Sequence, residues 1–180
     1  MMLFEQRSKG EMFMFKVNDY VVYGLTGVCQ IIDIEKVKDT NNDQTDYYVL
    51  RPVYDNINNM IIKTPLNNPK ILIRKVITKQ EAAALMAKMT QKEPVWIEDN
   101  RERSLHFKTI LKTGNCEELI GLIKTLYHEK EARSVEGKNI TSTDEQIMKT
   151  AEKQLHEELA VALDLSPDEV VAYILEHLSS

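Results

Sequence analysis

Cationic side chains follow one side of a predicted helix over residues 99–112. At about 100° per residue, Arg101, Lys108 and Lys112 fall along one side. The apolar residues fall roughly opposite and are expected to face a core: Phe107, Ile110 and Leu111. Cations in line on a solvent-facing side can neutralise successive phosphates of a nucleic acid. Ordinary surface charge is the alternative interpretation of this cationic row (Arg101, Lys108, Lys112).

Trp96 is the only tryptophan of the chain and lies just before this helix, within Pro94-Val95-Trp96-Ile97. A large aromatic side chain in such a place can anchor a core or a domain interface. It can also act as an apolar wedge against a base step of a DNA duplex. Both roles remain open from the sequence.

Catalytic motifs are missing from the sequence. It has no Gly-rich phosphate loop followed by Lys, no His-Glu-x-x-His and no Gly-x-Ser-x-Gly. Glu157 and Glu158 are interpreted as part of a solvated acidic helix face. Cys29 and Cys116 are far apart in apolar surroundings, which predicts buried, reduced thiols and no metal site. We therefore expect no enzymatic activity, no cofactor, no small-molecule ligand and a reducing cytoplasm.

Charge is distributed unevenly over the 180 residues, whose formal net charge is −5. An acidic balance argues mildly against a general nucleic-acid binder. Between Lys63 and Lys92, however, Glu81 is the only acid among seven Lys and Arg, whereas acids dominate from Asp144 onward. An anion contact is therefore expected before the C-terminal helices. No apolar run approaches the roughly 20 residues needed to span a bilayer, so no membrane association is expected.

Residues 14–77 have the pattern of a β module. Runs rich in Val, Ile and Tyr are separated by turn-forming residues and predict five strands: 20–23, 28–34, 47–53, 60–64 and 71–76. Gly24 and Gly27 bracket the first turn. Five short antiparallel strands close best as a small β-barrel.

Residues 78–180 have helical periodicity and predict about five helices. Thr78 with Glu81 has the spacing of a capping box, and Gly114 is expected to end the helix that begins near Asp99. Three further starts are predicted from capping patterns at Asn115 with Glu118, at Ser142 with Glu145 and at Ser166-Pro167. Residues 1–13 are expected to be a leader or an added extension without regular structure.

Four blocks, taken in order, resemble proteins of the CarD type. The blocks are Phe15–Tyr23 with Gly27-Val28; Tyr47–Arg51 followed by Ile61–Pro65 and Asn67; Trp96 with Arg101, Arg103 and Lys112–Asn115; and Ala151–Leu155 with Glu157–Ala160. The β blocks are shared in style with other small barrels, whereas the ordered set across both modules is specific. The same kind of β module occurs in the transcription-repair coupling factor, but this sequence has no helicase motif.

The resemblance implies a fold and a set of partners. The β module would be a Tudor-like five-stranded antiparallel β-barrel that docks on the β subunit of bacterial RNA polymerase, with Lys63 and Arg51 as contacts. The all-α module would lie on upstream promoter DNA without reading sequence and stabilise the open complex. Trp96 would enter the minor groove, and Arg101, Arg103 and Lys108 would contact phosphates. We expect a monomer in that complex.

Two other kinds of protein remain as alternatives. The first is a protein–protein adaptor whose acidic helical module binds another protein and not DNA; the net charge and the Glu98-Asp99 pair beside Trp96 favour it. The second is an RNA-binding barrel, which would expose basic and aromatic residues on its surface.

Overall fold

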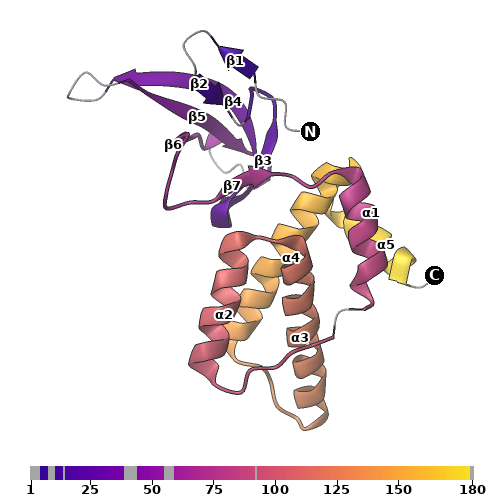
Figure 1. The fold of residues 1–180 in the computed structure, drawn as a ribbon. Helices are drawn as coiled ribbons and strands as arrows, with labels where there is room; N and C mark the ends of the chain where they lie inside the picture. The colour runs from indigo at the N-terminus through magenta and orange to yellow at the C-terminus, as the bar shows by residue number, and fades with distance from the viewer. Residues whose placement is uncertain are drawn as a thin grey trace. The chain divides into compact units, whose positions relative to one another are not determined.

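The computed structural model describes residues 5–7, 11–13, 15–38, 44–54, 59–91 and 93–178. The chain divides into two compact units, Met1–Lys75 and Val76–Ser180, called here the β unit and the helical unit. Strands come first and helices after, so the predicted α+β layout is confirmed (Figure 1). The boundary between the units lies two residues before the predicted one. Within the described residues, no helix is both long and apolar enough to cross a membrane.

The β unit is built on one five-stranded antiparallel sheet (Figure 1). Its elements are β3 (Tyr20–Tyr23), the 3-10 turn η1 (Gly24–Thr26), β4 (Gly27–Lys38), β5 (Gln44–Pro52), β6 (Ile62–Pro65) and β7 (Ile73–Lys75). The strand order is β6-β5-β4-β3-β7. All five predicted strands are therefore present, with β4 four residues longer at its C-terminal end than expected.

The sheet is open, so the closed Tudor-like barrel that was predicted is not what the described residues form. Among the described residues, β6 pairs only with β5, and β7 pairs only with β3. Closure would need these two strands to pair with each other, and at four and three residues they are short. The long β4–β5 hairpin, paired from Cys29–Pro52 out to Lys38–Gln44, extends well past β3.

One face of the sheet carries the core of the β unit. Every second residue of the central strands points into it: Val21 and Tyr23, Cys29 and Ile31, Tyr48 and Leu50. Phe15 completes this cluster, and its backbone N–H donates to the Tyr48 hydroxyl at 3.2 Å. Tyr48 and Leu50 are no more than 1 % exposed, but Val22, Val28 and Val49, which alternate with the cluster, are buried as well, so alternation alone does not distinguish the two faces.

A tight turn joins β3 to β4, as the bracketing glycines predicted. Gly24 and Gly27 have φ of 47° and 86°, values that favour glycine. A Cβ on Gly24 would lie 2.8 Å from Cγ2 of Ile71, so there is also no space for a side chain. The turn is held by the Gly24 N–H, which donates to the carbonyl of Leu72 at 3.0 Å.

Residues 5–7 and 11–13 form two short paired strands, so these residues differ from the expectation that the first thirteen lack regular structure. Strands β1 (Glu5–Arg7) and β2 (Glu11–Phe13) pair antiparallel, with Arg7 opposite Glu11. Three paired positions lack the periodic pattern by which the longer strands were identified.

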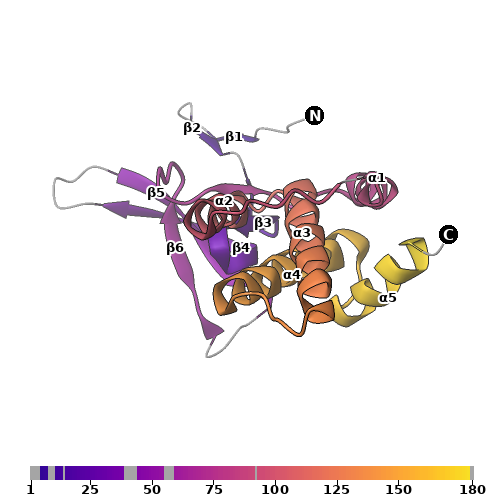
Figure 2. The same ribbon diagram turned by 90° about the horizontal axis from the view of Figure 1, so that it is seen from below.

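The described residues of the helical unit form five helices, as predicted. They are α1 (Lys79–Met89), α2 (Asn100–Thr113), α3 (Cys116–Val135), α4 (Ser142–Leu163) and α5 (Pro167–Leu178). Helix α4 contacts each of the other four, and the two views show it beside α3 (Figures 1 and 2). Its apolar residues Ile147, Ala151, Leu155 and Leu159, spaced at four-residue intervals, are buried. Helix α4 is therefore the centre of the unit.

Side-chain caps set the starts of these helices. Thr78 and Glu81 form the predicted capping box, and Asp99 and Asn115 accept hydrogen bonds from the third residue of α2 and α3. At α4 the prediction is wrong by one residue, because Thr141 is the cap and not Ser142. The Thr141 hydroxyl accepts from the backbone N–H of Asp144 at 3.1 Å, a contact that Ser142 inside the helix cannot make.

Glu157 and Glu158 are buried, which overturns their interpretation as a solvated face. Their exposed fractions are 6 % and 1 %. Glu158 accepts from the backbone N–H of Ile77 at 3.1 Å and from the Cys116 thiol at 3.2 Å. It thereby joins the segment before α1 and the start of α3 to α4. Burial raises the pKa of Glu157, and the charge of Lys153 opposes this rise.

Candidate polymerase and nucleic-acid contact sites

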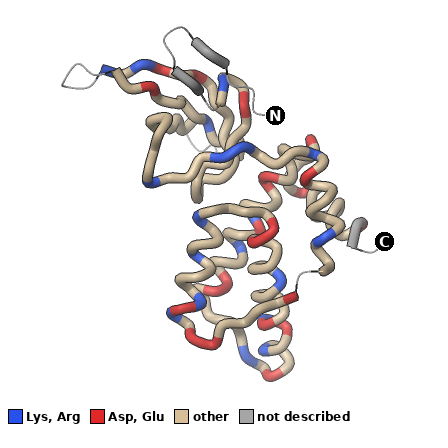
Figure 3. Tube along the Cα trace, viewed as in Figure 1, with Lys and Arg blue, Asp and Glu red and all other residues tan. Residues whose placement is uncertain are grey.

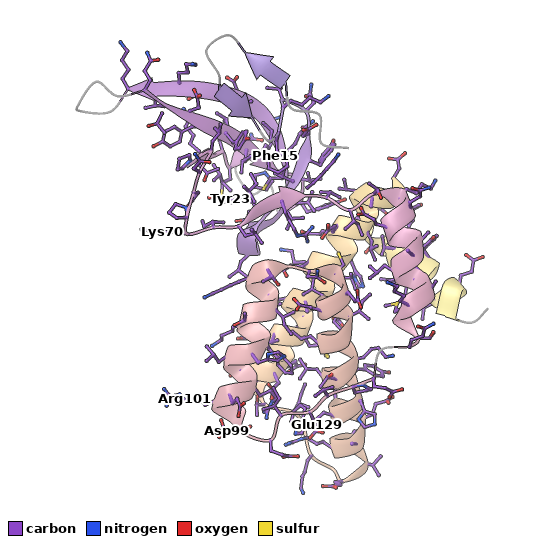
Figure 4. The ribbon with its side chains drawn as sticks, in the orientation of Figure 1. Phe15, Tyr23, Lys70, Asp99, Arg101 and Glu129 are labelled. Carbon is purple, nitrogen blue, oxygen red and sulfur yellow. The ribbon has the colours of Figure 1, made fainter. Side chains whose placement is uncertain are left out.

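The cationic row is exposed along helix α2. Arg101, Lys108 and Lys112 all face solvent, whereas Phe107, Ile110 and Leu111 are buried, as the helical spacing predicted. At a rise of 1.5 Å per residue, the row extends for about 16 Å. Figure 3 shows Lys and Arg following α2, and Figure 4 shows Arg101 beside Asp99 where the helix begins. Within the described residues none of the three cations forms an ion pair, so their charges remain available to a ligand.

Arg103 does not belong to this row, which corrects its assignment as a phosphate contact. Its side chain is 2 % exposed and pairs with Asp144, from Nε to Oδ1 at 3.3 Å and from Nη2 to Oδ2 at 2.8 Å. Nη1 donates to the carbonyls of Ile97 and Glu98, and Nη2 donates to Asn100 Oδ1 at 2.6 Å. Every nitrogen of the guanidinium is therefore used inside the protein, and none can reach a phosphate.

Trp96 lies partly buried in the irregular segment between α1 and α2. The guanidinium carbon of Arg103 lies 4.0 Å from the centroid of its ring, and that of Arg133 lies 5.8 Å away. Arg133 in turn donates a hydrogen bond to Glu129, one turn earlier on α3. The only tryptophan is thus packed against two cations, and part of it remains accessible.

Lys63 and Arg51 lie on the same face of the sheet. Lys63 of β6 is directly opposite Val49 of β5, and Arg51 is two residues further along β5. Directly paired residues project to the same side of a sheet, as do residues two apart, so the two cations are diagonal neighbours on one face. Both are exposed. The structure therefore brings together the two residues that the sequence assigned to polymerase binding.

Glu35 of β4 is a neighbour that the sequence did not identify. Its Oε2 accepts from Lys63 Nζ at 2.6 Å, across the intervening strand β5. A bulge after Ile31 places Glu35 opposite Tyr47 and so on the Lys63 face. This shift in register is invisible in the alternation of the sequence, which explains why the pair was missed. Lys63 is therefore ion-paired within the β unit.

The residues that the structure describes include no group of three or more His, Cys, Asp or Glu side chains that could hold a metal ion. Cys29 and Cys116 are both buried and outside disulfides, as predicted.

Comparison with known proteins identifies the β unit. Residues 15–77 match the family described as the CarD-like/TRCF RID domain, which is about a third of the chain. Apart from Val76 and Ile77, the helical unit lies outside this match. No curated protein matches the sequence. Residues 15–77 therefore form a CarD-like/TRCF RID domain, which confirms the resemblance to CarD-type proteins for the β unit and supports an interaction with RNA polymerase.

Proposed function

We propose that this protein is a bacterial transcription regulator that bridges RNA polymerase and promoter DNA. The β unit would bind the polymerase β subunit through the face that carries Lys63 and Arg51. The helical unit would contact upstream DNA and stabilise the open promoter complex, without enzymatic activity or a cofactor. The domain match supports the polymerase partner, and one monomer per complex would suffice.

The observation that carries the DNA contact is the cationic row. Three exposed cations follow one side of α2, and none is neutralised by an acid in the described residues. Such a row fits the phosphate backbone, which is read without regard to sequence. Trp96 lies just before α2 and would supply the apolar contact in the minor groove at the edge of the melted DNA.

The energetics suit a contact that works only within a larger complex. Non-specific DNA binding at physiological salt has dissociation constants of roughly 10⁻⁴–10⁻⁶ M. For an acidic protein with three phosphate contacts, we expect a dissociation constant at the weak end of this range or larger. Attachment to polymerase makes the DNA contact intramolecular and raises its effective concentration. A stabilisation of only about 1.4 kcal/mol would shift the open-complex equilibrium tenfold.

The test is the lifetime of the open complex on one promoter with the housekeeping polymerase, with and without this protein. We expect a longer lifetime with the wild-type protein and none of this gain with Lys63→Glu. An unchanged lifetime, with polymerase binding retained, would refute the DNA contact. Failure of the isolated β unit to bind the polymerase β subunit would refute the bridge itself.

A protein–protein adaptor is the second candidate. The exposed acids Glu98 and Asp99 lie between Trp96 and Arg101, and the net charge is −5, both of which disfavour phosphate. An adaptor would still bind polymerase but would engage another protein through the helical unit. Binding to a forked promoter duplex that requires polymerase and weakens with salt would exclude it.

A further inference from the structure

The segment 93–99, which carries Trp96, is fixed by side chains on both sides of the tryptophan. Before it, the backbone N–H of Val95 donates to the Thr125 hydroxyl at 3.1 Å. Thr125 is 5 % exposed, and its own hydroxyl donates to the carbonyl of Gly121 at 2.8 Å. The residue before Trp96 is therefore attached to a buried position on α3, even though the Val95 side chain is 70 % exposed.

Arg103 fixes the residues after Trp96. Its Nη1 donates to the carbonyl of Ile97 at 2.8 Å and to that of Glu98 at 3.3 Å. The guanidinium itself cannot rotate, because Asp144 accepts from both its Nε and its Nη2. Asp144 is oriented in turn by Thr141, whose hydroxyl donates to its Oδ2 at 2.8 Å. The edge of the guanidinium thus joins α2, the start of α4 and the 93–99 segment.

The same guanidinium lies over the indole ring. A centroid distance of 4.0 Å is well within the range of a cation–π contact. The cation is 2 % exposed, whereas the ring is only partly buried. Arg103 therefore covers an inner surface of Trp96 and leaves another surface of the ring to solvent.

Stability alone does not account for a buried ion pair, because the cost of desolvating the two charges offsets much of their attraction. Apolar residues of similar volume often stabilise a fold as well as or better than a buried pair. What a planar, bidentate guanidinium adds is direction, since its edge and its face are fixed together. At this place the fixed directions are those of the Trp96 backbone and of the Trp96 ring.

We propose that Arg103, oriented by Asp144, is the positioning residue that presents Trp96 to the DNA. Arg103 itself touches no nucleic acid; it sets the ring plane so that the accessible surface of the indole faces its ligand in advance. Positioning before binding spares the cost of ordering the side chain during the encounter. The role of Trp96 towards DNA in this inference rests on the proposed function, whereas the positioning of the ring by Arg103 does not.

The first experiment uses the wild-type protein alone. Because Trp96 is the only tryptophan, all tryptophan fluorescence comes from this ring. We expect an anisotropy decay dominated by tumbling of the protein, together with one ¹⁹F resonance after incorporation of 5-fluorotryptophan. Fast local rotation of large amplitude, or several slowly exchanging resonances, would overturn the proposal without any variant.

The second experiment removes the pair without leaving an unpaired charge, with the double variant Arg103→Met and Asp144→Leu. We expect the fold to persist, because both polar partners are replaced by apolar ones. Trp96 should then gain fast local motion and become more accessible to iodide. A matched control is Lys149→Gln, which removes an exposed cation from α4. A folded double variant with unchanged anisotropy and quenching would overturn the proposal.

A third measurement separates this inference from the proposed function. Trp96→Ala should shorten the open-complex lifetime, and the folded double variant should shorten it to a similar degree with polymerase binding intact. If Trp96→Ala leaves the lifetime unchanged, the DNA role of Trp96 fails, while the anisotropy still decides whether Arg103 positions the ring. If Trp96→Ala acts and the folded double variant does not, the positioning role is refuted and the DNA contact stands.

Discussion

Neutralising the cationic row should change how salt affects the open complex. Each Lys or Arg that neutralises a phosphate contributes about −0.9 to the slope of log affinity against log salt concentration. The row offers three exposed side chains with no acid bonded to them in the described residues. The wild-type protein should therefore add a slope of about −2.7 that is lost when Arg101, Lys108 and Lys112 are all changed to Gln.

This slope predicts a measurable range. Between about 50 and about 200 mM KCl, an added slope of −2.7 corresponds to a loss of roughly 40-fold in the contribution of the protein to complex stability. Polymerase itself makes many salt-dependent contacts, so the informative quantity is the difference between two slopes. Each single substitution to Gln should remove about a third of that difference.

The assay is the decay of open complexes on one promoter at several KCl concentrations, with saturating wild-type or variant protein. A matched control changes Lys130, Lys138 and Lys149 to Gln, which removes the same charge from exposed positions that are paired with acids. A control slope equal to that of the wild-type protein is expected. If the α2 triple variant and the control shift the slope equally, net charge is responsible and the row is not a phosphate contact.

Three further predictions concern the rest of the chain. Gly24→Ala should destabilise the β unit by about 1 kcal/mol or more in urea unfolding. The new Cβ would lie 2.8 Å from Ile71, and the φ of 47° at this position is unfavourable for alanine. Unchanged stability would show that the turn relaxes. Glu35→Gln should strengthen polymerase binding, because it releases Lys63 from its ion pair. The expected gain is at most about 1 kcal/mol, the upper range for an exposed ion pair. Weaker binding in a titration would mean that Glu35 itself touches polymerase. Glu157→Gln should stabilise the fold at neutral pH, because burial raises the pKa of the Glu157 carboxyl and the ionised form therefore destabilises the folded state as pH rises above the usual carboxyl range. In acid, where the carboxyl is protonated, the gain in stability should vanish. A gain that does not depend on pH in thermal unfolding would contradict this origin.

Local sequence signals account for most element boundaries. Thr78 and Asn115 cap the helices that they were expected to cap, Asp99 caps the helix that was expected to begin near it, and Gly114 ends α2 with a φ of 60°. These interactions join residues three or four apart, so the sequence displays both partners. The misplaced cap of α4 is an error of one residue between adjacent hydroxyl-bearing residues.

The wrong predictions for charged residues have a different cause. Arg103 lies four residues before Phe107 and seven before Ile110, so helical spacing alone puts it on the buried face. Its partner Asp144 is 41 residues away, and no local pattern links the two. Glu158 likewise lies on the buried side of α4 with Leu155, whereas the groups that donate hydrogen bonds to it, the Ile77 N–H and the Cys116 thiol, come from other parts of the chain. Spacing could show that these charges are buried, but only the tertiary fold shows what neutralises them.

The burial of both native thiols makes this protein well suited to site-directed labelling. Cys29 is 0 % exposed and Cys116 is 6 % exposed, and the sequence has no other cysteine. Thiol reagents act on accessible thiolates, so a cysteine introduced on the solvent side of α2 would be the one that reacts readily. A cleavage reagent or photo-crosslinker attached there would mark the nucleotides, or the protein, that lie against this helix in the assembled complex.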